Sequence, residues 1–86
     1  MKQITFGGNK NVIGKRLSVL RKEKGITQSD LAARMQTLSV NIDQQMISKI
    51  EKNQRQVTDY ELACFCKCLA VEPNEILKDF AQFLDF

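Results

Sequence analysis

Apolar residues recur along this chain at the three- and four-residue spacing of a helix that buries one face. Ile13, Leu17 and Leu20 lie at positions i, i+4 and i+7, and similar spacing returns in four later segments. The first predicted helix begins near Asn11, the second spans 28–36 and the third spans 44–52. The fourth begins after Thr58 and the fifth at Pro73. Because no segment alternates long enough to pair as a strand, the pattern predicts an all-α fold of five helices.

Capping residues mark where two of these helices begin. Thr27 and Asp30 have the spacing of a capping box, in which a hydroxyl and a carboxylate satisfy free backbone N–H groups. Thr58 and Glu61 repeat the pattern thirty-one residues later. The second and fourth helices therefore have defined starting points.

The helix over 44–52 presents polar residues at its start. Asp43 is expected to cap it, so that Gln44 and Gln45 fall in the first exposed turn. Ile47 and Ile50 lie on the other face and are expected to hold the helix against the core. This arrangement presents two amides to a partner.

The chain outside these helices divides into an arm and a connector. Residues 1–10 show no period and contain Gly7-Gly8, so we expect a flexible arm before a single folded domain over 11–86. Residues 37–42 are expected to connect the second and third helices and to bury three apolar side chains in the core: Leu38, Val40 and Ile42.

Composition narrows the classes of function. With 86 residues and a net charge of +3, the chain suits one small domain and a polyanionic partner, although charge alone does not decide. The chain has no histidine, the commonest general base, and no nucleophile and base can be assembled into a catalytic site, so we expect no enzyme. No membrane segment, secretory signal, cofactor or small-molecule ligand is evident, which favours the cytoplasm.

Three cysteines lie close together, as Cys64, Cys66 and Cys68. Only Cys64 and Cys68 share a helical face, and two thiolates do not make a closed zinc site, so no metal site is expected. We expect free thiols, with Cys66 and Cys68 replacing small core residues and Cys64 most open to oxidation.

Several short stretches appear in a characteristic order: Ile13-Gly14-Lys15-Arg16-Leu17 with Leu20-Arg21, Gly25-Ile26-Thr27-Gln28 with Leu31-Ala32, Ile47-Ser48-Lys49-Ile50-Glu51, Leu69 with Val71, and Ile76-Leu77. In this order and spacing the chain resembles the Xre-type helix-turn-helix family, which includes the DNA-binding domains of lambdoid phage repressors and Cro. The resemblance covers about residues 12–77. It implies a compact five-helix, lambda-repressor-like domain whose third helix enters the major groove of double-stranded DNA.

The resemblance also implies roles for individual residues. Base contacts fall to Gln44, Gln45 and Ser48, and the amide of glutamine matches the N6 and N7 edge of adenine. Phosphate contacts fall to Gln28, Lys49, Lys52, Asn53 and Arg55. Arg21 and Glu51 lie where the family often joins the first helix to the third by an ion pair. The expected function is sequence-specific binding of double-stranded DNA by a transcriptional repressor.

Two departures from the family pattern concern local geometry. The link over 36–42 is longer than usual and lacks the expected glycine, and Ala70 replaces a glycine common at the end of the fourth helix.

The tail is unusually apolar, and we expect a homodimer through Phe80, Phe83, Leu84 and Phe86. The alternative is a protein-interaction module, such as an antitoxin, that keeps the fold without reading DNA.

Overall fold

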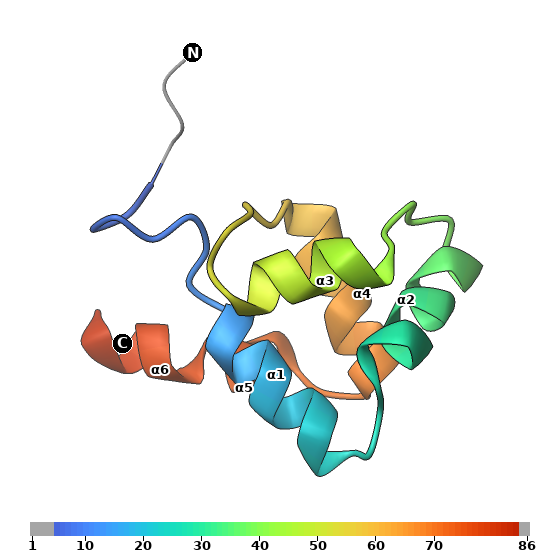
Figure 1. Cartoon of the computed structure of the whole chain (residues 1–86). Coiled ribbons are helices and arrows are strands. Elements are labelled where there is room, and N and C mark those ends of the chain that lie inside the picture. Colours follow the sequence, from blue (N-terminus) through green and yellow to red (C-terminus); the bar gives the residue numbers. More distant parts are fainter. Residues whose placement is uncertain (1–4, 85–86) are drawn as a thin grey trace.

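The computed structural model describes residues 5–84, which fold into six helices joined by short turns (Figure 1). The helices are α1 (Gly14–Glu23), α2 (Gln28–Thr37), α3 (Gln44–Glu51), α4 (Asp59–Leu69), α5 (Pro73–Ile76) and α6 (Lys78–Phe83). The strand-like pairing within residues 5–84 is limited to one antiparallel bridge between Phe6 and Asn9. The expectation of an all-α fold is therefore confirmed. None of the described helices has the length and apolar character needed to cross a membrane.

The expected fifth helix is divided in two. Leu77, with φ −95° and ψ 3°, ends α5 and starts α6, so the two helices are not one continuous rod. Ile76 on α5 is buried in the core, whereas Phe83 on α6 is 72% exposed. Figure 1 shows α6 extending away from the other helices. The prediction of a single helix here was wrong because the apolar spacing continues across a residue at which the backbone turns.

The helix starts agree with the capping residues. The Thr27 hydroxyl accepts from the backbone N–H of Asp30 at 3.0 Å, and the Asp30 carboxylate accepts from that of Thr27 at 3.1 Å. Thr58 and Glu61 form the second capping box. The Asp43 carboxylate accepts from the backbone N–H of Met46 at 2.8 Å. These three predictions are confirmed because each depends on residues within three positions of one another.

The core lies where α3 packs against α1 and α2, while α4 packs against α2 and α5 (Figure 1). Its largest fully buried side chains come from five helices and the connector: Leu17, Leu31, Met35, Ile42, Ile47, Ile50, Phe65, Leu69 and Ile76. The apolar face of α3 is thus completely covered. Its other face remains available to solvent.

The connector between α2 and α3 is anchored at both ends. Val40 and Ile42 are buried as expected, but Leu38 is 40% exposed and does not enter the core. Ser39 takes the left-handed conformation, with φ 64°, that the missing glycine would favour. The Val40 N–H then reaches back to the carbonyl of Met35 at 3.1 Å, which closes the end of α2. The longer link is therefore a fixed turn.

Residues 6–11, most of which belong to the predicted arm, form hydrogen bonds with one another and with the domain. Phe6 and Asn9 exchange backbone hydrogen bonds of 2.9 and 2.8 Å across a turn of two glycines. The Asn53 Oδ1 accepts from the backbone N–H groups of Lys10 at 2.8 Å and of Asn11 at 3.1 Å. Residues 1–4 of the predicted arm lie outside the described residues.

Candidate nucleic-acid interface

The exposed face of α3 carries a shallow polar groove. Its lining consists of Gln44, Gln45, Ser48, Lys49, Lys52 and Gln54, and its volume is about 260 Å³. The three residues predicted to read bases therefore lie together with two of those predicted to contact phosphate. Gln54 is an addition that sequence reasoning missed. Asn53, which tolerates the left-handed conformation, could have indicated it. Its φ of 61° turns the chain back along α3, so that the Gln54 N–H donates to the Lys49 carbonyl at 2.7 Å.

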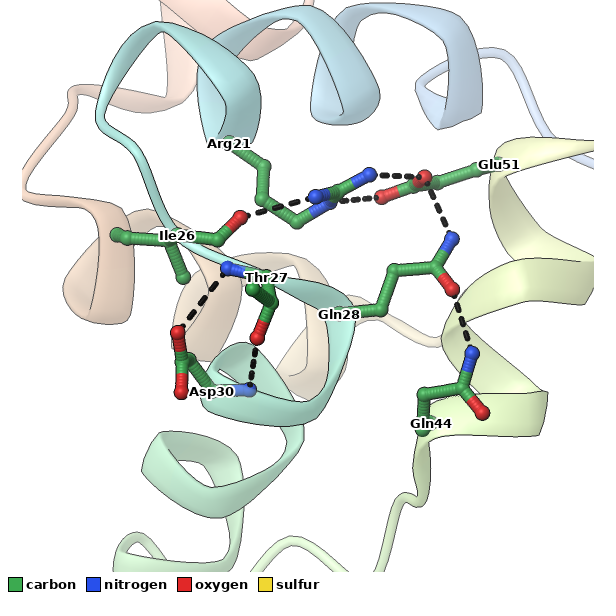
Figure 2. Close-up of polar contacts among 7 residues, drawn as sticks. All are labelled: Arg21, Ile26, Thr27, Gln28, Asp30, Gln44 and Glu51. Atoms are coloured by element: carbon green, nitrogen blue, oxygen red, sulfur yellow. Dashed lines mark hydrogen bonds and ion pairs between the residues drawn. The ribbon is translucent and has the colours of Figure 1, made fainter.

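A chain of hydrogen bonds runs from α1 through α3 and α2 to the start of α3 (Figure 2). Arg21 makes a two-pronged ion pair with Glu51, with Nε to Oε2 at 2.8 Å and Nη2 to Oε1 at 3.0 Å. The remaining Nη1 donates to the carbonyl of Ile26 at 2.9 Å. The two side chains are only 9% and 7% exposed. The structure thus brings together the pair that the family resemblance implies, in a largely buried form.

Gln28 continues this chain towards the predicted base-reading residues. Its Nε2 donates to Glu51 Oε1 at 2.9 Å, and its Oε1 accepts from Gln44 Nε2 at 2.6 Å. The amide of Gln44 is therefore oriented by a residue of α2 that is itself oriented by a buried ion pair (Figure 2). A side chain held in this way loses less conformational freedom on binding than a free one.

The pKa of Glu51 reflects this environment. Burial raises the pKa of Glu51, but hydrogen bonds from Arg21 and Gln28, together with the charge of Arg21, lower it by more. The pKa of Glu51 therefore lies below its usual value. Glu51 is consequently ionised at neutral pH. Breaking one partner of such a pair leaves a buried charge without compensation.

Gly14 allows α1 and α3 to approach closely at this end of the molecule. A Cβ added at Gly14 would collide with the backbone carbonyl oxygen of Ile50. The same carbonyl accepts from the Asn11 Nδ2 at 3.0 Å, and the Asn11 Oδ1 accepts from the Gly14 N–H at 2.7 Å. The Asn11 side chain therefore accepts from the first N–H of α1 and also ties the start of α1 to the end of α3.

Two residues predicted to contact phosphate also bind other parts of the protein. Asn53 was expected at a phosphate, but its Oδ1 is occupied by two backbone N–H groups and its Nδ2 donates to Asn9 Oδ1 at 2.7 Å. Arg55 pairs instead with Glu61, with Nη1 to Oε1 at 3.0 Å and Nη2 to Oε2 at 2.9 Å. Both side chains are thus held by contacts within the protein, and their phosphate contacts stay predictions.

The two lysines of the groove have the freedom that Asn53 and Arg55 lack. Lys49 and Lys52 are exposed, and neither forms an ion pair with another described residue. Both line the groove together with Ser48 and the two glutamines. Long cations beside a polar groove suit an anionic partner.

The tail residues lie on a different surface. Phe80 and Phe83 stack with ring centroids 6.3 Å apart, and Phe6 contacts both rings edge-on at 5.2 and 6.0 Å. Phe83 and Leu84 are 72% and 42% exposed. This aromatic cluster (Phe6, Phe80 and Phe83) leaves apolar surface open to solvent. Phe86, also expected there, lies outside the described residues.

A short helix that presents amides and lysines, and that a preceding helix braces at its start, defines a helix-turn-helix domain of the kind that binds DNA. The chain matches the family model described as helix-turn-helix over residues 17–76. It therefore belongs to the Xre-type helix-turn-helix family, as its resemblance predicted, and this is a family of DNA-binding transcriptional regulators.

Solved structures show the same fold. The restriction-modification controller protein C.AhdI from Aeromonas hydrophila is 30% identical, with a TM-score of 0.66 over 74% of this chain and 89% of the other. The clp gene regulator ClgR from Corynebacterium glutamicum is 23% identical in one structure, with a TM-score of 0.73 over 87% of this chain and 91% of the other. A second structure of that regulator has a TM-score of 0.74 at 22% identity, over 88% of this chain and 76% of the other. No curated protein matches the sequence.

Proposed function

We propose that this protein is a sequence-specific transcriptional repressor that binds double-stranded DNA as a homodimer, with α3 in the major groove. The observation that carries the proposal is the bond between Gln28 and Gln44, because it fixes an exposed amide on the open face of α3. The printed names of the similar structures, a controller protein and a gene regulator, support a regulatory role.

The free atoms of the groove suit the edge of adenine. One N–H of the Gln44 amide is used by Gln28, which leaves a second N–H for adenine N7 and the Oε1 to accept from N6. The Gln45 amide makes no hydrogen bond with another described residue, so its donors and acceptor are all available. Ser48, one turn further along α3, offers a hydroxyl that can pair with either base type.

The cations and one buttressing amide would hold the protein to the DNA backbone. Lys49 and Lys52 lie beside the reading residues and would neutralise phosphates without reading sequence. Gln28 keeps one N–H free beyond its bond to Glu51 and would donate it to a phosphate. Gln54, which also lines the groove, is added to this set.

The homodimer would use the aromatic cluster together with Leu84. One short helix buries too little surface for operator-level affinity, whereas two copies related by a two-fold axis would read half-sites about 34 Å apart. The exposed rings of α6 provide an apolar surface for that contact. A dimer seated on an operator would block access to the DNA, and repression is the role proposed.

Selection of bound sites from a random duplex pool, at low and at physiological salt, tests the proposal. The wild type should enrich a two-fold symmetric site. Gln44→Ala and Gln45→Ala should each relax the preference at one base pair by about 1–3 kcal/mol. Lys49→Ala, the matched control, should weaken all sequences alike and reduce the salt slope by about one. Failure to enrich any sequence, or unchanged preferences in both glutamine variants, would contradict it, as would binding that does not weaken with salt.

A further inference from the structure

Two sulfur atoms, one from α2 and one from α4, meet where these helices pack together. Cys68 Sγ lies 3.6 Å from Met35 Sδ on α2. Cys64 precedes Cys68 by one turn of α4 on the same face, and both cysteines are half-buried. Cys66 lies on the buried face of α4 and is 5% exposed.

The spacing of the two cysteines argues against a disulfide between them. Side chains at i and i+4 of a helix have Cβ atoms about 5–6 Å apart, whereas a disulfide requires about 3.5–4.5 Å. Cys64 and Cys68 can therefore be bridged within an intact α4 only by an atom that lengthens the link. A metal ion between the two sulfurs does this without unwinding the helix.

We propose that Cys64, Cys68 and Met35 form a binding site for a soft monovalent metal ion, with Cu(I) as the chemical type. Each thiol loses its proton and forms one sulfur–metal bond, and the Met35 thioether supplies a neutral third ligand. No oxidant or reductant takes part. Thiolate and thioether sulfur are the ligands that select Cu(I). Zinc does not fit, since no group of three or more His, Cys, Asp or Glu suited to a metal is found among residues 5–84.

Charge and solvation at the site agree with this chemistry. Two thiolates and one monovalent ion carry a net charge of −1, and Arg34 lies beside them, with its Nη1 donating to the Cys68 carbonyl at 3.1 Å. The ion displaces the thiol protons, so affinity for the ion should rise with pH.

The site connects two helices, and binding should stabilise the domain. Met35 lies in the last turn of α2, where its carbonyl accepts from the N–H groups of Leu38 and Val40 at the start of the connector to α3. An ion held by α2 and α4 would bind the folded chain in preference to the unfolded one. Saturation should therefore raise Tm by at least about 5 °C.

Anaerobic competition for Cu(I) against a chromogenic chelator tests the proposal on the full chain, without DNA. The wild type should bind one ion per chain at the site. Cys64→Ala and Cys68→Ala should each weaken that binding about a hundredfold, and Met35→Leu about tenfold. Cys66→Ala is the matched control, because it removes a thiol from the same helix, and it should leave the affinity unchanged. Circular dichroism of each metal-free variant verifies its fold.

Two results would overturn the site. Equal affinities in Cys64→Ala and Cys66→Ala would show that the ion binds single thiols without the pair. An unchanged affinity in Met35→Leu would remove the thioether from the ligand set and with it the link between α2 and α4. Since no DNA is present, either failure is separate from a failure of the proposed DNA binding.

Discussion

The two ends of α3 are held in very different ways. At its end, Glu51 is fixed by a buried ion pair to Arg21, and the carbonyl of Ile50 lies directly against Gly14. At its start, Gln44 and Gln45 are exposed, and the local supports are the Asp43 cap and one bond to Gln28. The rigid end sets the position of the helix, and the open end is left free for a partner. The Gln44 amide at the open end is therefore positioned by Gln28, which is itself bonded to Glu51 at the opposite end.

The largest effect should come from the rigid end, through Glu51→Gln. This variant keeps the side-chain shape but leaves the Arg21 charge buried without its partner, so it should lower the free energy of unfolding by about 3 kcal/mol. Urea unfolding measures this. Glu23→Gln, at an exposed position of α1, is the control. A loss below about 1 kcal/mol would mean that the pair behaves as an ordinary surface contact.

Acid should weaken the same end. The pKa of Glu51 lies below its usual value, so as pH falls the unfolded chain takes up a proton before the folded one does. Stability present above the unfolded pKa is thus lost as pH falls, from about pH 5 downwards. The dependence on pH should be shallower in Glu51→Gln, though not absent, because the pKa of Glu61 is also lowered. Identical pH profiles for the two proteins would exclude Glu51 as a cause.

Gly14→Ala should have the next largest effect. Its methyl group would collide with the Ile50 carbonyl and force α1 and α3 apart, at a cost of about 2 kcal/mol. Thermal unfolding measures the loss, and the neighbouring exposed substitution Lys15→Ala provides the reference. A Gly14→Ala protein as stable as Lys15→Ala would show that the close approach is not required.

At the open end, Asp43→Ala should cost about 1 kcal/mol, the usual contribution of a helix cap. Hydrogen exchange should locate the change in the first turn of α3, with protection at Ile50 retained. Equal loss of protection along the whole of α3 would contradict the view that different contacts hold its two ends.

Gln45→Ala should change stability least, by less than about 0.5 kcal/mol, because the side chain is exposed and bonded to no other described residue. Chemical denaturation would measure this beside the selected operator's affinity. A large loss of stability would assign Gln45 a structural role and remove it from the proposed base contacts.

The sequence predicted best what depends on neighbouring residues. The capping boxes at Thr27 and Thr58 follow from interactions within one turn of helix. The prediction for Arg21 and Glu51, thirty residues apart, rested on resemblance to a family, since no local pattern links them. Local sequence patterns therefore predict where helices begin, but not which residues of different helices contact one another.

What the sequence did not indicate depends on distant contacts or on single residues at which the backbone turns. Asn53 binds residues 42 and 43 positions earlier, and nothing near it in sequence indicates that its side chain makes these bonds. Leu38 shares the alternation of Val40 and Ile42, yet the left-handed turn at Ser39 leaves it exposed. The division between α5 and α6 at Leu77 likewise interrupts an unbroken apolar pattern.

Mapping of amide chemical shifts by NMR, as a selected operator duplex is added, tests the central claim most directly. The account predicts that the largest changes fall at the start of α3, on Gln44, Gln45 and Ser48 and the side-chain amides of the two glutamines. Changes concentrated on α6 and residues 5–10, with the start of α3 unaffected, would contradict it.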